Sequence, residues 1–225
     1  MKFLTFILLV LSATLHAGDL KFEKDLYEAD ANLKDSEVIR EFNFTNTSSK
    51  AITIRLADAG CSCVAVEFLN GKSTYAAGES GVMRATFKIE NSQGTIDKTI
   101  QIWLASDPDE KPSSQVSFRI HVPIAISLEP KTLNWKSNDA PEPKVIRVNI
   151  NYEKPVQVTA VSSTSENMIT EIVTIEKGKS YDIKLTPKST ASPEISMIRI
   201  ETDIEIEKFR LQQGFARILS PTTKP

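Results

Sequence analysis

The stretch Val38-Ile39-Arg40-Glu41-Phe42-Asn43-Phe44 decides the fold class of this chain. Large apolar side chains at positions 38, 42 and 44 share one phase of a two-residue period, and polar side chains at positions 41 and 43 share the other. Successive side chains of a strand point to opposite faces of a sheet, so this alternation is typical of a half-buried strand. The stretch therefore predicts a β protein.

The same alternation recurs through the first half of the chain. Further runs cover residues 20–23, 52–57, 64–68, 83–89, 96–104 and 116–122. Stretches rich in Asn, Ser, Gly, Asp and Pro separate these runs, as turns require, and no segment between them sustains a helical period. About seven strands is the usual number for an immunoglobulin-like sandwich, in which two sheets pack face to face.

The second half repeats this pattern without repeating the sequence. Its short alternating runs cover residues 133–135, 145–150, 156–161, 169–175, 181–185, 195–200 and 209–218. We therefore predict an all-β chain with two tandem immunoglobulin-like β-sandwich domains, residues 18–126 and residues 127–219. Residues 220–225 contain no apolar side chain that could be buried, so we expect a disordered tail there.

The N-terminus has the parts of a secretory signal peptide. Lys2 supplies the positive start, residues 3–11 form an uncharged apolar run, and small residues lead to Ala17. We predict a signal peptide at residues 1–17, with cleavage after Ala13 and an uncleaved anchor as the alternatives. The apolar run is well short of the ~20 residues that span a bilayer, so we expect a secreted or periplasmic protein without membrane insertion of the mature chain.

The composition argues against nucleic acid as a partner. Lys and Arg together number 27 and Asp and Glu number 29, which gives a formal net charge of −2 at pH 7. This near balance leaves no basic footprint for phosphates or for an anionic membrane surface.

A set of short motifs in the first half resembles a known family. The motifs are Phe42-Asn43-Phe44-Thr45-Asn46, Gly60-Cys61-Ser62-Cys63, Ala77-Gly78-Glu79-Ser80-Gly81, Phe87, Gly94, Lys98-Thr99-Ile100 and Ser106-Asp107. Over about residues 20–126 they resemble the bacterial domain-of-unknown-function family 1573, which is similar to the immunoglobulin-like Hydin and major-sperm-protein domains. The resemblance implies an immunoglobulin-like fold and a bacterial envelope location, and it implies no activity. The chain departs from the family pattern at Ser62, Val64 and Ala77.

Cys61 and Cys63 are the only cysteines, and a single residue separates them. Alternate residues of an extended strand are about 6.6 Å apart, whereas the Cβ atoms of a disulfide lie ~3.5–4.5 Å apart. The two cysteines can therefore bond to each other only if Ser62 lies in a turn, which the preceding Gly60 favours. A loop of three residues gives about 1.6 kcal/mol in the chain-entropy model, against about 3 kcal/mol for fifteen residues. Such a disulfide would stabilise the fold only weakly. It would also be easily reduced, which suits a redox or switching role.

Three interpretations of the couplet stay open: a labile disulfide, a metal site, and small residues packed beside a strand. Two thiolates on one short turn form a soft chelate that suits Cu(I). Zinc needs more ligands, and His121, the only histidine after the signal peptide, belongs to a different strand. We interpret His121 as an ordinary strand histidine and Met83, which is in phase with Ala85 and Phe87, as a core residue.

Two acidic clusters are explained better by solvation than by chemistry. Asp107-Pro108-Asp109-Glu110 lacks the glycine and the spaced ligands of a calcium loop, so it predicts a hairpin tip. Asp203, Glu205 and Glu207 alternate with isoleucines, which predicts a strand with three acids on one solvated face.

These observations favour a non-enzymatic protein, with no catalytic site and no cofactor predicted. We expect it to bind an envelope or secreted protein through strand edges or loops, as sandwich modules commonly do. The alternative is a thiol-based Cu(I) carrier or redox-active protein that acts through Cys61 and Cys63.

Overall fold

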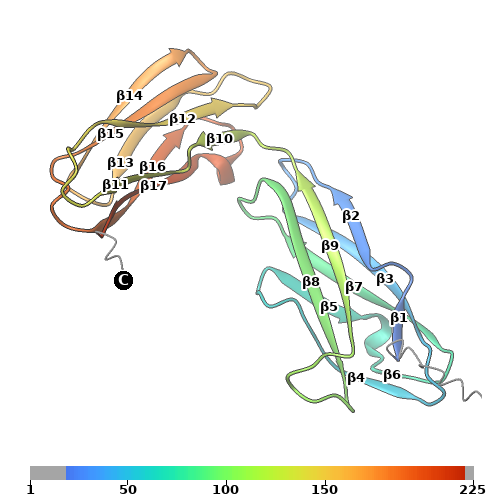
Figure 1. The fold of residues 1–225 in the computed structure, drawn as a ribbon. Helices are drawn as coiled ribbons and strands as arrows, with labels where there is room; N and C mark the ends of the chain where they lie inside the picture. Colours follow the sequence, from blue (N-terminus) through green and yellow to red (C-terminus); the bar gives the residue numbers. More distant parts are fainter. Residues whose placement is uncertain (1–18, 221–225) are drawn as a thin grey trace, which may run out of the picture. The chain divides into compact units, whose positions relative to one another are not determined.

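The computed structural model describes residues 19–220, and these fold almost entirely into β-strands (Figure 1). Its helical elements are two 3-10 helices of three residues each, η1 (Leu69–Gly71) and η2 (Glu207–Phe209). The predicted all-β class is confirmed. The predicted signal peptide, residues 1–17, and residues 221–225 of the predicted tail lie outside the described residues. Within residues 19–220, no helix has the length and apolar character needed to cross a membrane.

The first nine strands form two sheets that face each other. They are β1 (Leu20–Phe22), β2 (Leu26–Asp30), β3 (Glu37–Asn46), β4 (Ile52–Asp58), β5 (Val64–Phe68), β6 (Thr74–Tyr75), β7 (Ser80–Lys88), β8 (Gly94–Leu104) and β9 (Ser114–Val122). One sheet has the order β1-β3-β7-β5 and the other the order β2-β9-β8-β4-β6. Phe42 on β3 packs edge-on against Phe118 on β9, with ring centroids 5.9 Å apart, so the apolar faces of the two sheets meet in one core.

Residues 38–44 form part of β3, as their alternation predicts. Phe42 and Phe44 are fully buried, while Ile39 on the other face is 46% exposed. Gly81 on β7 allows the core to close at this point. A Cβ atom at Gly81 would lie 2.5 Å from the rings of both Phe44 and Tyr75. Only glycine therefore fits there without displacing an aromatic side chain.

Asn46 ends β3 as a fully buried polar residue. Its Nδ2 group donates to the carbonyl oxygens of Lys50, Tyr75 and Ala76 at 2.8–3.0 Å. Its Oδ1 atom accepts from both the amide and the hydroxyl of Ser48, at 2.9 and 2.7 Å. A buried amide is tolerated because its hydrogen bonds are made, and here they join the turn after β3 to the turn before β7.

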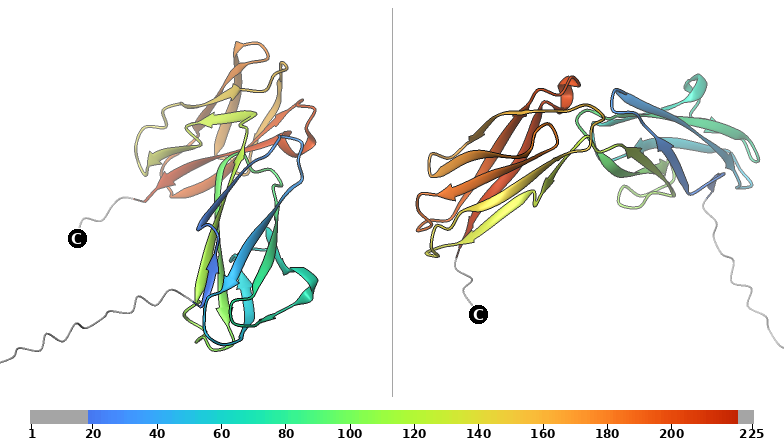
Figure 2. Two further views of the ribbon diagram at one scale, coloured as in Figure 1. Left: turned by 90° about the vertical axis from the view of Figure 1, so that its right-hand side faces the viewer. Right: turned by 90° about the horizontal axis from the view of Figure 1, so that it is seen from above.

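Eight strands form the second pair of sheets (Figures 1 and 2). They are β10 (Ile126–Glu129), β11 (Thr132–Lys136), β12 (Lys144–Ile150), β13 (Val158–Ser163), β14 (Met168–Glu176), β15 (Ser180–Pro187), β16 (Glu194–Thr202) and β17 (Leu211–Leu219). The sheet orders are β10-β12-β15-β14 and β11-β17-β16-β13, with β11 and β17 parallel. One buried cluster joins Ile183 and Leu185 of the first of these sheets to Ile198 and Ile200 of the second.

The described residues divide into two compact units. One comprises residues 19–27, 39–87 and 98–118, and the other comprises residues 28–38, 88–97 and 119–220. Strand pairing divides the chain at a different place. β9, the last strand of the first pair of sheets, ends at Val122, and Ile126 at the start of β10 pairs with Ile150 in the second pair of sheets. The predicted domain ranges, 18–126 and 127–219, stay a prediction.

Two expectations about individual strands were wrong or incomplete. Residues 203–207 do not form a strand, because β16 ends at Thr202 and η2 begins at Glu207. Ile204 and Ile206 are buried there, so the alternation reflects packing of an irregular segment. The runs also missed β2, β6 and β10, which are short. In β2 the buried residue is Ala29, and so small a side chain gives a weak periodic signal.

Candidate functional site: the cysteine turn and an open sheet edge

The cysteine turn connects β4 in one sheet to β5 in the facing sheet. Gly60 starts the turn with φ of +69°, a left-handed conformation that glycine adopts without steric cost. Its amide donates to Oδ1 of Asp58 at 2.9 Å, so the side chain of the last β4 residue holds the chain reversal. The turn expected around Ser62 is therefore present.

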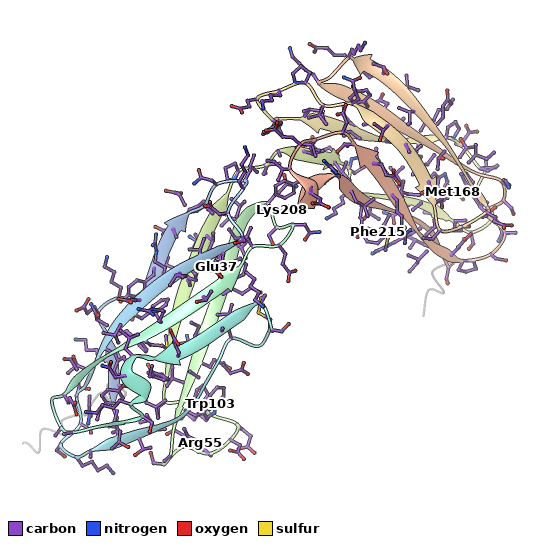
Figure 3. The ribbon with its side chains drawn as sticks, turned by 180° about the vertical axis from the view of Figure 1, so that it is seen from behind. Glu37, Arg55, Trp103, Met168, Lys208 and Phe215 are labelled. Carbon is purple, nitrogen blue, oxygen red and sulfur yellow. A yellow bond between two sulfur atoms is a disulfide. The ribbon has the colours of Figure 1, made fainter. Side chains whose placement is uncertain are left out.

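This turn brings the two sulfur atoms together. The Sγ atoms of Cys61 and Cys63 lie 2.18 Å apart and their Cα atoms 5.3 Å apart, and Figure 3 draws the bond between them. Both cysteines are half-buried and Ser62 is exposed. The turn is therefore partly open to solvent, and thiol–disulfide exchange requires access of this kind. Whether the pair is oxidised in the cell, or holds Cu(I) when reduced, stays a prediction.

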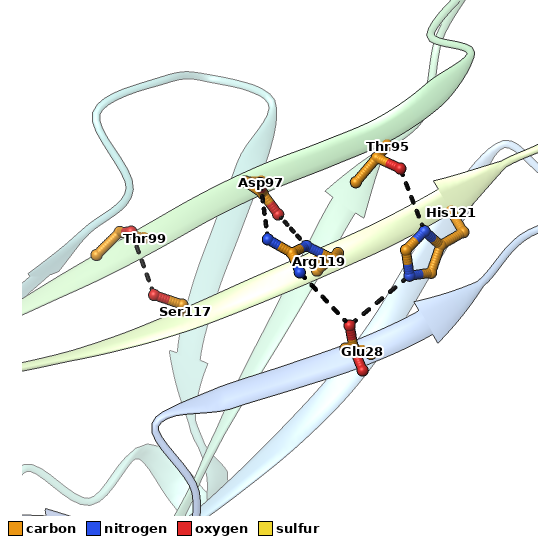
Figure 4. Close-up of polar contacts among 7 residues, drawn as sticks. All are labelled: Glu28, Thr95, Asp97, Thr99, Ser117, Arg119 and His121. Atoms are coloured by element: carbon orange, nitrogen blue, oxygen red, sulfur yellow. Dashed lines mark hydrogen bonds and ion pairs between the residues drawn. The ribbon is translucent and has the colours of Figure 1, made fainter.

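Among residues 19–220, no third His, Cys, Asp or Glu ligand is found for such an ion. In the part of the chain that the structure describes, no three His, Cys, Asp or Glu side chains form a group that could hold a metal. His121 instead joins a polar network on the outer face of β2, β9 and β8 (Figure 4). Its Nδ1 lies 3.3 Å from the hydroxyl of Thr95, and its Nε2 lies 3.8 Å from a carboxylate oxygen of Glu28.

Arg119 is the centre of that network. Its guanidinium donates to both carboxylate oxygens of Asp97, at 2.7 and 3.2 Å, and lies 3.8 Å from Glu28. The hydrogen bond from Arg119 holds the pKa of Asp97 below its usual value. These charges stabilise one another on a solvated sheet face, where ion pairs contribute little free energy. The interpretation of His121 as a strand histidine fits these contacts.

The acidic loop between β8 and β9 is built to hold its own shape. The carboxylate of Asp107 accepts from the amides of Leu104 and Ser113 and from the Ser113 hydroxyl. The Asp109 carboxylate accepts a hydrogen bond from Arg55 at 2.7 Å, and the Asp109 carbonyl oxygen accepts one from the indole N–H of Trp103 at 3.0 Å. Figure 3 labels Arg55 and Trp103. The loop therefore has the structural role that its sequence predicts.

The acids after β16 also have structural partners. Asp203 accepts from the amide of Gln157 at 2.7 Å. Glu205 accepts from the Tyr152 hydroxyl at 2.5 Å and from Lys154 at 2.7 Å. The hydrogen bonds from Lys154 and then Tyr152 lower the pKa of Glu205 to about 2.

A second candidate site, which the sequence analysis missed, is the free edge of β14. β14 is nine residues long and pairs only with β15, so one of its edges has no neighbouring strand in the sheet (Figure 1). The other outer strands of the four sheets are β1, β5, β2, β6, β10, β11 and β13, and each has six residues or fewer.

Two hydrogen bonds fix which backbone groups of β14 face outward. The amide of Lys188 donates to the carbonyl of Asn167, and the amide of Ile150 donates to the carbonyl of Lys179. Antiparallel partners alternate between hydrogen-bonded and non-bonded pairs. We followed this alternation from each of the two bonds along the registers of β12, β15 and β14. Both bonds lead to the same assignment: the backbone groups of Ile169, Glu171 and Val173 bond to β15. The N–H and C=O groups of Thr170, Ile172 and Thr174 therefore point to the open edge.

The outer face of β14 is unusually apolar. Ile169 and Ile175 are each 52% exposed and Val173 is 36% exposed, and no other strand has three large exposed aliphatic side chains among residues 19–220. Natural edge strands are usually protected by short length, lysine, proline or bulges. β14 contains neither lysine nor proline. Its charged residues are Glu171, which lies 3.5 Å from Lys184, and Glu176, and its single bulge lies near its end, between Thr174 and Glu176.

Comparison with known proteins confirms the predicted family resemblance. Residues 20–120 match the model of the family described as Protein of unknown function (DUF1573). Among curated proteins, none matches this chain.

Several solved structures are similar to this chain at low sequence identity. A protein of unknown function from Porphyromonas gingivalis W83 is 12% identical, with a TM-score of 0.35, over 89% of this chain and 99% of that chain. The ASH/PapD-like domain 7 of human CEP192 is 6% identical, with a TM-score of 0.39, over 54% of this chain and 97% of that chain. The YadV chaperone is 11% identical, with a TM-score of 0.32, over 89% of this chain and all of that chain.

Proposed function

Because residues 20–120 match a family of unknown function, we propose a function from the surface of the molecule. The protein is a non-enzymatic binding module of the bacterial envelope, secreted or periplasmic, and it binds another protein by accepting a strand at the open edge of β14. The observation that carries the proposal is the row of outward backbone groups at Thr170, Ile172 and Thr174 beside exposed aliphatic side chains.

Strand addition is a well-defined recognition mode. Main-chain hydrogen bonds to a free sheet edge supply affinity, and side chains alternate between the two faces to supply specificity. An added strand would place its outer side chains beside Ile169 and Val173, where apolar residues would be shielded from water.

Proline at Thr170 tests the proposal. The Thr170 N–H points outward, so Thr170→Pro leaves the ladder between β14 and β15 intact and obstructs any strand that approaches the edge. Glu171→Pro is the matched control, because the Glu171 N–H is directed to β15. We expect Thr170→Pro to fold and Glu171→Pro to be strongly destabilised, as measured by thermal unfolding.

Binding is measured with a photo-crosslinking residue in place of Val173, in cells of the native host. Ile195 is the control position, since it is 70% exposed but lies on β16, an inner strand of its sheet. We expect one defined adduct from position 173, none from position 195, and no adduct when Thr170→Pro is also present. Equal labelling from both positions, or labelling that survives Thr170→Pro, would contradict the proposal.

The second candidate is the thiol function of Cys61 and Cys63, which the contact between their sulfur atoms favours. The doubly substituted chain, Cys61→Ser with Cys63→Ser, separates the two functions. A binding module keeps its adduct at position 173 in this variant, whereas a thiol-based carrier or redox protein loses its activity. Titration of the reduced protein with Cu(I), followed by native mass spectrometry, tests the carrier directly: one bound ion that disappears in the double variant supports it.

A further inference from the structure

The exposed part of β14 reads almost the same in both directions. Residues 169–175 are Ile-Thr-Glu-Ile-Val-Thr-Ile, and only Glu171 and Val173 break the symmetry about Ile172. A near palindrome matters for an edge strand because two copies that pair antiparallel place residue 172 − n opposite residue 172 + n. The same residue type then lies on both sides of the new ladder.

Resting on the proposed function, we infer that the strand accepted at this edge is β14 of a second copy of the chain, which gives a two-fold symmetric dimer. Pairing about Ile172 matches the free backbone groups. Ile172 faces Ile172 of the second copy, and Thr170 faces its Thr174. These are the positions whose N–H and C=O groups point outward, so each pair exchanges two hydrogen bonds.

The side chains also match in this register. Thr170 and Thr174 form a threonine pair at each end of the ladder, and threonine pairs are favourable across antiparallel strands. Ile172 meets its own copy, and Ile169 approaches Ile175 of the second copy. On the outer face Glu171 lies opposite Val173 of the second copy, so the two Glu171 carboxylates do not face each other.

Other registers are less favourable. A shift that centres the axis on Thr174 places Ile172 opposite Glu176 of the second copy, and it brings the bulge between Thr174 and Glu176 next to the centre of the new ladder instead of its end. A shift that centres the axis on Thr170 places Glu171 opposite Ile169 and separates Thr170 from Thr174. Axes on Glu171 or Val173 would also join outward groups, but they place Glu171 opposite its own copy or Ile169 opposite Lys177. Only the axis on Ile172 pairs Thr170 with Thr174.

Charges at the two ends of β14 favour the same antiparallel arrangement. Glu166 precedes the strand, and Lys177 and Lys179 follow it. In the register about Ile172, Glu166 of one copy approaches the end of β14 at which Lys177 of the other copy lies. Lys179 already forms an ion pair with Glu176 of its own chain at 2.9 Å. Opposite charges therefore approach each other at both ends of the dimer.

A pair of charge variants at Val173 tests both the occupant and the register. Val173→Glu places two glutamates opposite Glu171 in the dimer, whereas Val173→Lys places two lysines there, and both variants remove the same apolar side chain. We expect sedimentation velocity of the mature chain, from micromolar to submillimolar concentration, to show a monomer–dimer equilibrium. We expect the dissociation constant of Val173→Glu to exceed that of Val173→Lys at least ~10-fold, since two facing pairs change sign.

Ile195→Glu is the matched control for a general loss of exposed apolar surface, and it should leave the dissociation constant unchanged. Thermal unfolding of every variant confirms that it is folded. A wild-type chain that stays monomeric at all concentrations, or equal dissociation constants for Val173→Glu and Val173→Lys, would overturn the dimer. If the chain is monomeric while position 173 still crosslinks to a different protein in a manner that Thr170→Pro prevents, the proposed function stands and only this inference fails.

Discussion

Asn46→Ala should destabilise the first pair of sheets more than any other polar substitution on β3. Asn46 is fully buried, and its side chain makes five hydrogen bonds: Oδ1 accepts two, and the two Nδ2 hydrogens are shared among three carbonyl oxygens. Alanine removes all five and leaves backbone groups of two turns without these partners. The chain cannot compensate locally, because the groups belong to segments about thirty residues apart.

The magnitude follows from how many of those groups water can reach. Each buried group that loses its partner costs about 1–3 kcal/mol, and groups that water reaches cost less. The bond to the Tyr75 carbonyl is buried, and those to Lys50 and Ala76 are partly buried. We therefore expect a loss of about 3 kcal/mol. With a urea m-value of ~2 kcal/mol/M, the unfolding midpoint falls by about 1.5 M.

The assay uses one tryptophan for each pair of sheets. Trp103 lies on β8 and Trp135 on β11, and both are buried, so urea unfolding in a Trp135→Phe background follows the sheets that contain Asn46. Asn43→Ala is the control, since Asn43 is exposed on the same strand and its side chain donates to Glu23; its midpoint should move little. Asn46→Asp keeps the shape and removes the donor. If Asn46→Asp is as stable as the wild type, the reasoning about the three donated bonds is refuted.

Three further predictions concern packing, pH and the cysteines. Gly81→Ala should lower the stability of the first pair of sheets by about 1–3 kcal/mol, because the new Cβ would lie 2.5 Å from the rings of Phe44 and Tyr75; a midpoint in urea equal to that of the wild type would contradict this. Lys154 and Tyr152 lower the pKa of Glu205 from 4.5 to about 2, so the stability that Glu205 contributes is complete above pH 4.5 and is lost as the pH falls towards 2. Thermal unfolding of Glu205→Gln should lack this part of the acid dependence, and an unchanged pH profile would show that Glu205 contributes nothing. Intact mass of the exported chain should show the loss of residues 1–17 and should gain two alkyl groups only after reduction, whereas labelling without reduction would show free thiols.

Much of the fold follows from local alternation. Several predicted strands bury the apolar residues of one face, as β3 does with Phe42 and Phe44 and β15 does with Tyr181, Ile183 and Leu185. Alternation fails where burial has another origin. Ile204 and Ile206 are buried in an irregular segment. Their two-residue spacing led to the wrong prediction of a strand, because two buried residues with this spacing also occur outside a hydrogen-bonded strand.

The cysteine turn could be predicted because all of its determinants are adjacent in the sequence. Gly60 supplies the left-handed residue, and Asp58 supplies the acceptor for its amide. The partners of His121 could not be predicted in the same way. Glu28 and Thr95 reach it from β2 and β8, and their proximity depends on the order of strands in the sheet.

The edge of β14 also could not be predicted from local sequence. The near palindrome of residues 169–175 is visible in the sequence, yet it has no consequence for a strand with neighbours on both sides. Ile195 on β16 is also an exposed apolar residue, but β16 is an inner strand of its sheet, between β17 and β13. Strand order decides which alternating segment has free N–H and C=O groups, and strand order is set by pairing between distant segments. A palindromic strand therefore predicts self-association only when it also has an open edge. In this chain both features occur in β14.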